Sequence, residues 1–479
     1  MIAVNYNKEY DAIIVGSGPN GLAAGIVLAQ NGKKVKIIEA SDSVGGGART
    51  KFLTLPGYKH DVCSAIHPMA MASPFFASLP LQNYGLKWIT PEFPFAHPLD
   101  NEPAAIMEMD VHRTASGLGR DNQTYLNLFN PIIKDFNDLL PDLLGPFNPF
   151  PKNPIKIAKF GLNAIRSASS LINSKFKETR SRALLAGLAA HSIQPLDNIA
   201  TSAITLVLGT AGHAVGWAMP EGGSQSLSNA LAEHFTFLGG EIETGKMISS
   251  VEQLSEAKAI LFDITPKQIL EIAENEIPKS YAKKLNRYRY GPGVFKLDLA
   301  LDGPIPWKDE NCCKAATVHI GGTFEEIAKA ESQVFEGIHP EKPFVLLAQQ
   351  SLFDSTRAPE GKHTVWCYCH VPNGSTLDMT QQIEDQIERF APGFKDLILF
   401  RNKMNAADIQ TYNPNYIGGD INGGIQDLRQ LYTRPVNLFD PYRIPNTSFF
   451  ICSSSSPPGG GVHGMCGYHA AQAVLNFLK

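Results

Sequence analysis

Cysteines are few in this sequence, and the seven present do not stand at the spacings of a redox or metal centre. No C-x-x-C pair of the kind used in disulfide exchange occurs. We therefore expect free thiols in a reducing cytoplasm, with no disulfide framework and no metal site. The seven are Cys63, Cys312, Cys313, Cys367, Cys369, Cys452 and Cys466.

Long apolar runs and excess charge of one sign are also missing. No stretch approaches the roughly 18 consecutive apolar residues that a membrane-spanning helix needs. The first residues lack the charged start and apolar core of a secretion signal. Because 42 Lys and Arg stand against 46 Asp and Glu, the net charge is only −4. These absences predict a cytoplasmic protein that neither spans a bilayer nor binds nucleic acid.

Two common catalytic motifs are absent as well. The sequence has no G-x-S-x-G nucleophile elbow and no H-E-x-x-H metal-binding helix, which argues against hydrolase and metalloenzyme chemistry. At 479 residues and 43% hydrophobic content, the chain is nevertheless long enough for two or three domains with sizeable cores.

Glycine, in contrast, is abundant, and its first run has the pattern G-x-G-x-x-G. The run follows an apolar, β-branched stretch at 10–15 and precedes a helical pattern that ends at Gly32. This context is typical of a dinucleotide site, where the glycines permit a tight turn and let the backbone approach a pyrophosphate. Free N–H groups at the helix start would face the anion. The predicted contacts are Gly16, Ser17, Gly18, Pro19, Asn20 and Gly21.

The second predicted strand ends in a carboxylate at a suitable distance. Glu39 lies 18 residues after Gly21 and can accept hydrogen bonds from an adenosine ribose. The glycine-rich loop that follows carries Arg49, whose guanidinium can grip the other side of the pyrophosphate. This arrangement favours FAD over NAD. The predicted contacts here are Glu39, Ala40, Gly46, Gly47, Ala48 and Arg49.

A second glycine run, at 459–464, lies where no chain remains to build a second nucleotide fold. We expect this run and the following helix, predicted over 465–478, to return to the first domain. There its backbone N–H groups would face a flavin ring that gains electron density. A plain helix-initiating turn is the alternative. The predicted contacts are Gly461, Val462, His463, Gly464 and Met465.

The middle of the chain supplies the remaining parts of the nucleotide sheet. Residues 219–254 are predicted to form a helix and then a strand whose Ile248 lies against adenine. Residues 259–266 are predicted to contain the strand that completes the sheet. The FAD-binding domain is therefore expected to be discontinuous in sequence.

Four longer strings carry a family resemblance: SAIHPMA at 64–70, RYGPGVFKLDLALDGPIPW at 289–307, STRAPEGKHTVWCYCHVP at 355–372 and PPGGGVHGMCGYHAA at 457–471. On these strings the chain resembles the phytoene desaturase-related FAD-dependent oxidoreductases, within the larger amine oxidase-like group. It is most similar to the subgroup of pyridine nucleotide-disulphide oxidoreductase domain-containing relatives. The subgroup's name implies a redox-active cysteine pair, which this sequence does not supply.

The resemblance implies an α/β fold with two domains. One is a Rossmann-like, three-layer ββα FAD-binding domain, which we assign to 1–75, 220–290 and 440–479. The other is a substrate domain with an antiparallel β-sheet. It is assigned to 76–219 and 291–439, with a helical cap around 125–215.

Two alternating stretches read as strands of the substrate domain. Residues 291–302 place apolar side chains on one face and Lys296 and Asp298 on the other, which predicts a half-buried strand. Residues 363–371 place aromatic side chains on one face, which we expect to floor a pocket beside the flavin. Core packing is the alternative. The substrate-contact candidates are Trp366, Tyr368 and Gln350.

A proline-punctuated, apolar and basic stretch at 139–182 is predicted to form helices of the cap. Its positive charge fits contact of 150–182 with an anionic membrane surface from which a lipophilic substrate is drawn. A solvated helical face is the alternative.

Two histidines are the candidates for catalysis, because their loops should approach the flavin and histidine titrates near neutrality. They are His67 and His463, and either one can instead be a structural hydrogen-bonding residue. The leading hypothesis is an FAD-dependent oxidoreductase that desaturates or saturates carbon–carbon bonds of a hydrophobic isoprenoid (carotenoid) or lipid-like substrate, with oxygen or a quinone as electron acceptor. A reduced-flavin isomerase and a non-catalytic FAD-binding partner protein remain alternatives.

Overall fold

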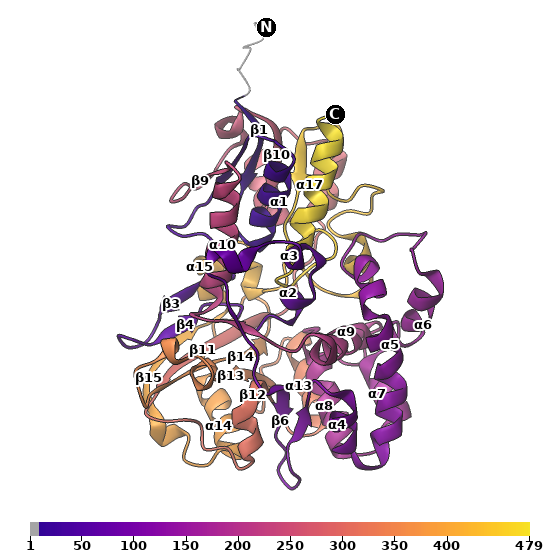
Figure 1. The fold of residues 1–479 in the computed structure, drawn as a ribbon, viewed down its shortest axis with the longest axis vertical. Helices are drawn as coiled ribbons and strands as arrows, with labels where there is room; N and C mark the ends of the chain where they lie inside the picture. Colours follow the sequence, from indigo (N-terminus) through magenta and orange to yellow (C-terminus); the bar gives the residue numbers. More distant parts are fainter. Residues whose placement is uncertain (1–8) are drawn as a thin grey trace, which may run out of the picture.

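A computed structural model describes residues 9–479, and in it the first glycine run directly follows a strand of a parallel sheet (Figure 1). The strand order is β16-β10-β1-β2-β9, and every neighbouring pair is parallel. The strands come from three separate stretches of the chain. Where the domains begin and end stays a prediction. The strands are β1 (Tyr10–Val15), β2 (Val35–Ile38), β9 (Glu241–Glu243), β10 (Ala257–Phe262) and β16 (Phe449–Ile451).

Helices from the first and last parts of the described chain lie side by side on this sheet. Helix α1 (Pro19–Gln30) packs against the last helix, α17 (Met465–Phe477), in one apolar core (Figure 1). The approach is close because a Cβ on Gly467 would fall 1.8 Å from the carbonyl oxygen of Asn20. The expectation that the C-terminal glycine run returns to the first domain is therefore confirmed. Helix α10 (Ser224–Phe237) packs against α1 as well.

The second sheet has seven strands in the order β15-β11-β14-β13-β12-β6-β7. Its pairs are antiparallel except for the parallel pair β12 and β6. The strands are β6 (Phe93–His97), β7 (Ala105–Met107), β11 (Gly293–Leu301), β12 (Ala315–Ile320), β13 (Val345–Ala348), β14 (His363–Val371) and β15 (Ile398–Met404).

The burial of β11 differs from the prediction. The alternation of 291–302 predicts a half-buried strand, but all nine residues of β11 are buried. Helix α14 (Thr380–Phe390) covers the leucine face. The opposite face, with Lys296 and Asp298, is covered by the hairpin that contains β4 (Lys59–Asp61). The prediction failed because alternation shows which residues share a face and does not show what covers it.

Helices from 122–214 form a layer beside the second sheet, as predicted for the cap (Figure 1). Leucines of α8 (Thr179–Ala190) belong to one apolar core together with the other cap helices and the aromatic side chains Trp366 and Tyr368 of β14. No helix within residues 9–479 is long and apolar enough to cross a membrane. The helices are α5 (Asn122–Leu143), α6 (Pro154–Ala164), α7 (Ala168–Lys175), α8 (Thr179–Ala190) and α9 (Thr201–Ala214).

Short elements connect these layers. The strands are β3 (Thr50–Phe52), β5 (Trp88–Ile89) and β8 (Met219–Pro220). The helices are α2 (Pro68–Ala72), α3 (Pro74–Ala77), α4 (Val111–Ser116), α11 (Pro266–Ala273), α12 (Lys279–Leu285), α13 (Phe324–Phe335), α15 (Ala406–Tyr412) and α16 (Leu428–Thr433).

Candidate functional site

A cavity of about 680 Å³ runs from the parallel sheet to the antiparallel sheet. One end is lined by the glycine run at 16–20, and the other end by Lys296, Trp366 and Tyr368 from β11 and β14. Ligand cavities in proteins commonly have this size and join two domains or sheets. The cavity therefore brings together segments that lie up to several hundred residues apart in the chain.

The glycine run forms a cradle at the start of α1. Gly16 has φ +100°, and a Cβ on Gly21 would fall 2.2 Å from the Gly16 carbonyl oxygen, so neither position accommodates a side chain. Gly18 is the N-cap of α1 and has no side chain to cap the helix, and Pro19 stands in the first turn. The backbone N–H groups at this helix start are thus placed for an anion.

Glu39 and Arg49 form a buried pair beside this cradle. An Nη atom of Arg49 lies 3.1 Å from Glu39 Oε1, and the same guanidinium donates to the Ser43 carbonyl oxygen at 2.7 Å. Glu39 also accepts hydrogen bonds from the backbone N–H and the hydroxyl of Ser17, at 2.9 and 2.6 Å. Glu39 and Arg49 both line the cavity. Their predicted roles on ribose and pyrophosphate stay predictions. The neighbouring candidates Ala40, Gly46, Gly47 and Ala48 line the cavity too.

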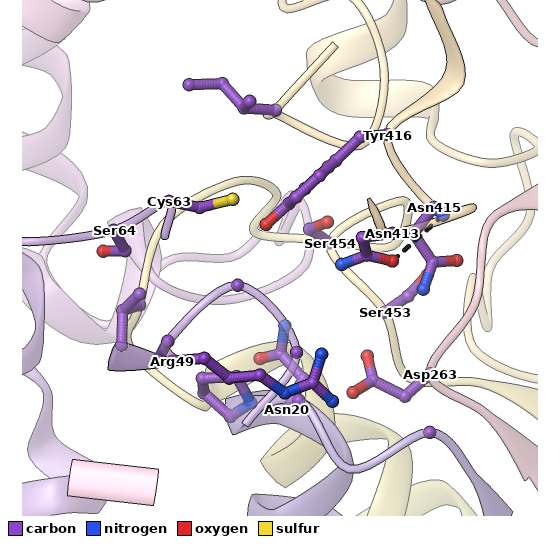
Figure 2. A pocket seen from close by; sticks show the side chains of 18 of the residues that line it. Asn20, Arg49, Cys63, Ser64, Asp263, Asn413, Asn415, Tyr416, Ser453 and Ser454 are labelled. Carbon is purple, nitrogen blue, oxygen red and sulfur yellow. Dashed lines mark hydrogen bonds between the residues drawn. The ribbon is translucent and has the colours of Figure 1, made fainter. Parts of the chain in front are cut away.

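The sequence interpretation missed Asp263, which immediately follows β10. Its Oδ2 accepts a hydrogen bond of 2.9 Å from the backbone N–H of Gly21. The pKa of Asp263 is raised from its ordinary 3.8 to about 8, mainly by burial and also by the nearby Glu39 charge, against the lowering effect of the Gly21 hydrogen bond. Figure 2 shows the carboxyl group facing the cavity on the same side as Asn20 and Arg49. The only sequence signal was an acid directly after a predicted strand.

The residues at this end fit a dinucleotide diphosphate. The glycine cradle offers backbone donors, and a neutral Asp263 adds no negative charge beside them. The side-chain oxygen of Asn20 is buried without a hydrogen-bond partner and belongs to a cavity-lining residue, so it can accept from a ligand hydroxyl or amine. Ile248 lines the cavity as well, but it lies in a loop after β9 and not on a strand, which corrects the prediction.

The C-terminal glycine run contributes less to the cavity wall than expected. Gly461 and Val462 line the cavity, whereas His463, Gly464 and Met465 do not belong to its lining. Gly464 is the N-cap of α17 and packs against α3. A Cβ at Gly464 would fall 2.7 Å from a ring carbon of Phe76.

His463 has the contacts of a structural residue. Its Nδ1 accepts a hydrogen bond of 3.0 Å from the backbone N–H of Met465, in the first turn of α17. Its carbonyl oxygen accepts from the Ser73 hydroxyl at 2.7 Å. Burial lowers the pKa of His463 to about 4, so the ring is neutral at pH 7. These contacts favour the structural alternative for this histidine.

His67 lines the cavity. Its Nε2 lies 2.8 Å from the Ser224 hydroxyl, and its Nδ1 lies 3.3 Å from the Ser64 hydroxyl. Burial lowers its pKa to about 4. Because hydroxyl groups donate as well as accept, the ring can hold its proton on either nitrogen. A neutral, cavity-facing imidazole of this kind is suited to orient a substrate or to relay a proton.

A charged cluster beneath the far end of the cavity was not predicted. Lys296 lines the cavity and donates a hydrogen bond to Asp298, two residues along β11. Asp298 Oδ1 lies 3.7 Å from His60 Nδ1, and Asp61 pairs with Arg357 at 2.7 Å. The Lys296 and Asp298 pair was visible as the polar face of the predicted strand. We expected that face to meet solvent, so it did not suggest a site.

Of the three substrate-contact candidates, two line the cavity and one does not. Tyr368 and Trp366 line the cavity, and the Trp366 indole N–H donates to the Cys63 carbonyl oxygen at 3.0 Å. Gln350 does not line the cavity, and its amide nitrogen lies 3.4 Å from Asp61 Oδ2. The Cys63 thiol, also at the cavity, is one of seven free cysteines.

Together the two sheets and the cavity define an α/β protein with a Rossmann-like nucleotide-binding domain and a second domain built on an antiparallel sheet. The family of NAD(P)-binding Rossmann-like domains matches residues 14–77. The chain is 26% identical to pyridine nucleotide-disulfide oxidoreductase domain-containing protein 2 from Rattus norvegicus, over 98% of this chain and 94% of that protein.

Two further comparisons extend over half of the chain or more. The chain is 23% identical to a phytoene desaturase (lycopene-forming) from Pseudescherichia vulneris, over 53% of this chain and 55% of that protein. The crystal structure of an oxidoreductase from Methanosarcina mazei superposes with a TM-score of 0.66 at 14% identity, and covers 97% of this chain and 99% of that one. The predicted fold class is confirmed, and the chain is similar to oxidoreductases over nearly its whole length.

Proposed function

We propose that this chain is an FAD-dependent oxidoreductase that acts on a hydrophobic substrate. The observation that carries the proposal is the single continuous cavity with an anion-binding glycine cradle at one end and an aromatic wall at the other. FAD would extend from the cradle towards the aromatic wall, because its diphosphate and its ring system lie far apart. The similarity to oxidoreductases in sequence and fold supports the same conclusion.

Bound FAD would supply a ring that accepts or donates a hydride. The chain's own residues would hold it along the cavity. The N–H groups around Gly18 would bind the diphosphate, and Glu39 would meet the ribose after exchanging its contact with Ser17. The loop at Gly461 and Val462 lines the cavity before α17, so it would contact the ring end.

The far end of the cavity would bind the substrate. Its wall is mainly apolar, with Leu208, Val294 and Leu346 beside the aromatic pair from β14. Apolar walls exclude water and orient a hydrophobic chain, while a few polar groups fix its position. His67 is the polar group there for holding or moving a proton, and Lys296 is a further polar group that can fix the position of a substrate.

The finer proposal concerns the reaction. A hydrophobic wall with few polar groups suits desaturation or saturation of a carbon–carbon bond in an isoprenoid or lipid-like molecule. The partial similarity to phytoene desaturase supports this choice. Oxygen or a quinone is the proposed electron acceptor. A reduced-flavin isomerase is the second candidate, because the same cavity would hold the same cofactor and substrate.

The proposal is tested with purified, FAD-loaded protein mixed without oxygen with a panel of isoprenoids and fatty compounds. An oxidoreductase bleaches the oxidised flavin band with one substrate of the panel, and an acceptor restores it. An isomerase needs prior reduction and consumes no acceptor. A non-catalytic FAD-binding protein shows no turnover, and His67→Gln then changes nothing. Protein that stays colourless and does not bind added FAD contradicts all three.

A further inference from the structure

Helix α6 (Pro154–Ala164) lies at the outer edge of the cap and is apolar on two opposite sides (Figure 1). On one side Phe160 and Ala164 are buried against the cap. On the other side Ile155 and Leu162 are 70% and 74% exposed. The spacing of seven residues places these two on one helix face. A helix that packs against protein on one face normally shows mainly charged and polar residues on the other, whereas the outer side of α6 carries two large apolar side chains beside Lys159.

Neighbouring side chains extend the exposed apolar face. Ile165, directly after α6, is 57% exposed, and Ile199 in the α8–α9 connection is 59% exposed. The two lie close together because the backbone N–H of Ala200 donates to the Ile165 carbonyl oxygen at 3.1 Å. Phe150, four residues before α6, is 86% exposed. We call Phe150, Ile155, Leu162, Ile165 and Ile199 the α6 face.

The chain segment that contains α6 is basic. Residues 143–177 contain no Asp or Glu and six Lys or Arg. Two acids of α5, Asp135 and Asp138, reach into this region and pair with Lys156 at 2.8 and 2.5 Å. Lys152 and Lys159 are exposed beside the apolar side chains. The rest of the chain is slightly acidic, so this basic region stands out from a net charge of −4.

We propose that the α6 face docks on an anionic lipid bilayer, with α6 lying in the plane of the membrane interface. Exposed Ile, Leu and Phe flanked by lysines is the pattern of such interfacial helices, because the apolar side chains enter the acyl region while the ammonium groups meet lipid phosphates. Helix α6 packs against α9, whose Leu208 lines the cavity, so docking would bring the substrate end of the cavity near the lipid. The broad stretch 150–182 considered from sequence is thereby narrowed to one helix face.

A vesicle cosedimentation experiment tests the proposal. The wild-type chain should sediment with vesicles that contain phosphatidylglycerol and much less with pure phosphatidylcholine vesicles, and raising the salt concentration should release it. The variant Ile155→Ser/Leu162→Ser should bind about tenfold more weakly or worse, because two apolar side chains no longer leave water. Phe237→Ser is the matched control, since Phe237 is 76% exposed on α10 and lies outside the α6 face.

Charge is tested in the same way. Lys152→Gln/Lys159→Gln should weaken binding about thirtyfold, because each of the two lysines near an anionic surface contributes about 1 kcal/mol. Lys283→Gln/Lys284→Gln on α12 removes the same charge and should have little effect. Wild-type protein that ignores phosphatidylglycerol vesicles at low salt overturns the proposal. So does equal loss in the Phe237 control. A dimer that disappears in Ile155→Ser/Leu162→Ser, without any vesicle binding by the wild type, assigns the face to a second copy of the chain instead. FAD content is measured in every variant, so failure of the cofactor proposal is seen separately.

Discussion

At the glycine end of the cavity the buried acid Asp263 accepts a hydrogen bond from the backbone. At the other end, which we call the sheet end because the antiparallel sheet lines it, the buried acids Asp298 and Asp61 each pair with a cationic side chain. Backbone N–H groups at a helix start can donate to a carboxyl group such as that of Asp263, and they can bind another anion there as well. A buried lysine or arginine paired with its acid is committed to that partner, because either charge left alone would be costly. The first end is therefore built to receive a charged ligand, and the second to remain rigid.

The largest expected effect comes from filling the glycine cradle. Gly21→Val places side-chain atoms where a Cβ is already 2.2 Å from the Gly16 carbonyl oxygen, so the loop must move. We expect cofactor binding to be lost, measured as absence of the flavin absorption band after reconstitution. Gly161→Ala on α6 is the control, because nothing lies within 4 Å of its Cβ position, and it should stabilise the fold by up to about 1 kcal/mol. Normal flavin content in Gly21→Val would show that the cradle does not hold the cofactor.

The next effect tests the sheet end. Lys296→Met leaves the Asp298 carboxyl group buried without its cation and should lower the free energy of unfolding by about 3–5 kcal/mol. Lys296→Met/Asp298→Asn should recover most of this loss, since no buried charge then remains unpaired. The control is Lys403→Met, whose exposed pair with Asp378 contributes less than about 1 kcal/mol. Urea denaturation measures all three. If Lys296→Met and Lys403→Met lower the free energy of unfolding equally, the buried charge pair does not make the sheet end more rigid than an exposed pair would.

A smaller, pH-dependent effect tests the glycine end. The pKa of Asp263 is raised to about 8 because burial disfavours the carboxylate, so the group is mostly protonated at pH 7 and ionises as the pH passes 8. FAD affinity should therefore fall by about tenfold between pH 7 and pH 9 as a negative charge develops beside the diphosphate. Asp263→Asn should keep its affinity across this range.

The same group affects folding in a defined direction. A carboxyl group whose pKa is higher in the folded chain favours folding most below its ordinary pKa of 3.8, and this contribution is lost as the pH rises through about 8. The free energy of unfolding should fall less with rising pH in Asp263→Asn than in the wild type. FAD affinity with the same pH profile in both proteins would assign the titration to another group.

The smallest expected effect concerns the second histidine. His463→Ala removes the ring that accepts from the Met465 N–H and should lower the free energy of unfolding by about 1 kcal/mol. Because His463 does not line the cavity, turnover by the FAD-loaded variant should stay close to wild type. Thermal unfolding and a turnover assay check both parts. A loss of turnover without a loss of stability would restore the catalytic hypothesis for this residue.

Much of the nucleotide-binding end was predictable because its signals are local. The strand at 10–15, the glycines at 16, 18 and 21 and the acid at Glu39 follow one another within 30 residues, and the structure places them along one edge of the parallel sheet. The return of the C-terminal run to the first sheet was also predicted, and β16, which precedes this run, pairs with β10 in the parallel sheet. The cap helices were predicted from composition and their bounds were not.

The sequence by itself determined the fold class and the dinucleotide cradle, because each depends on neighbours in the chain. Only the tertiary structure decided what lies at the cavity beside them. Asp263 meets Gly21 across 242 residues of sequence, and the burial of Lys296 and Asp298 depends on a hairpin more than two hundred residues earlier. Alternation gives the direction of a side chain along a strand, whereas solvent, a cation or another backbone reaches that side chain only after distant segments have packed.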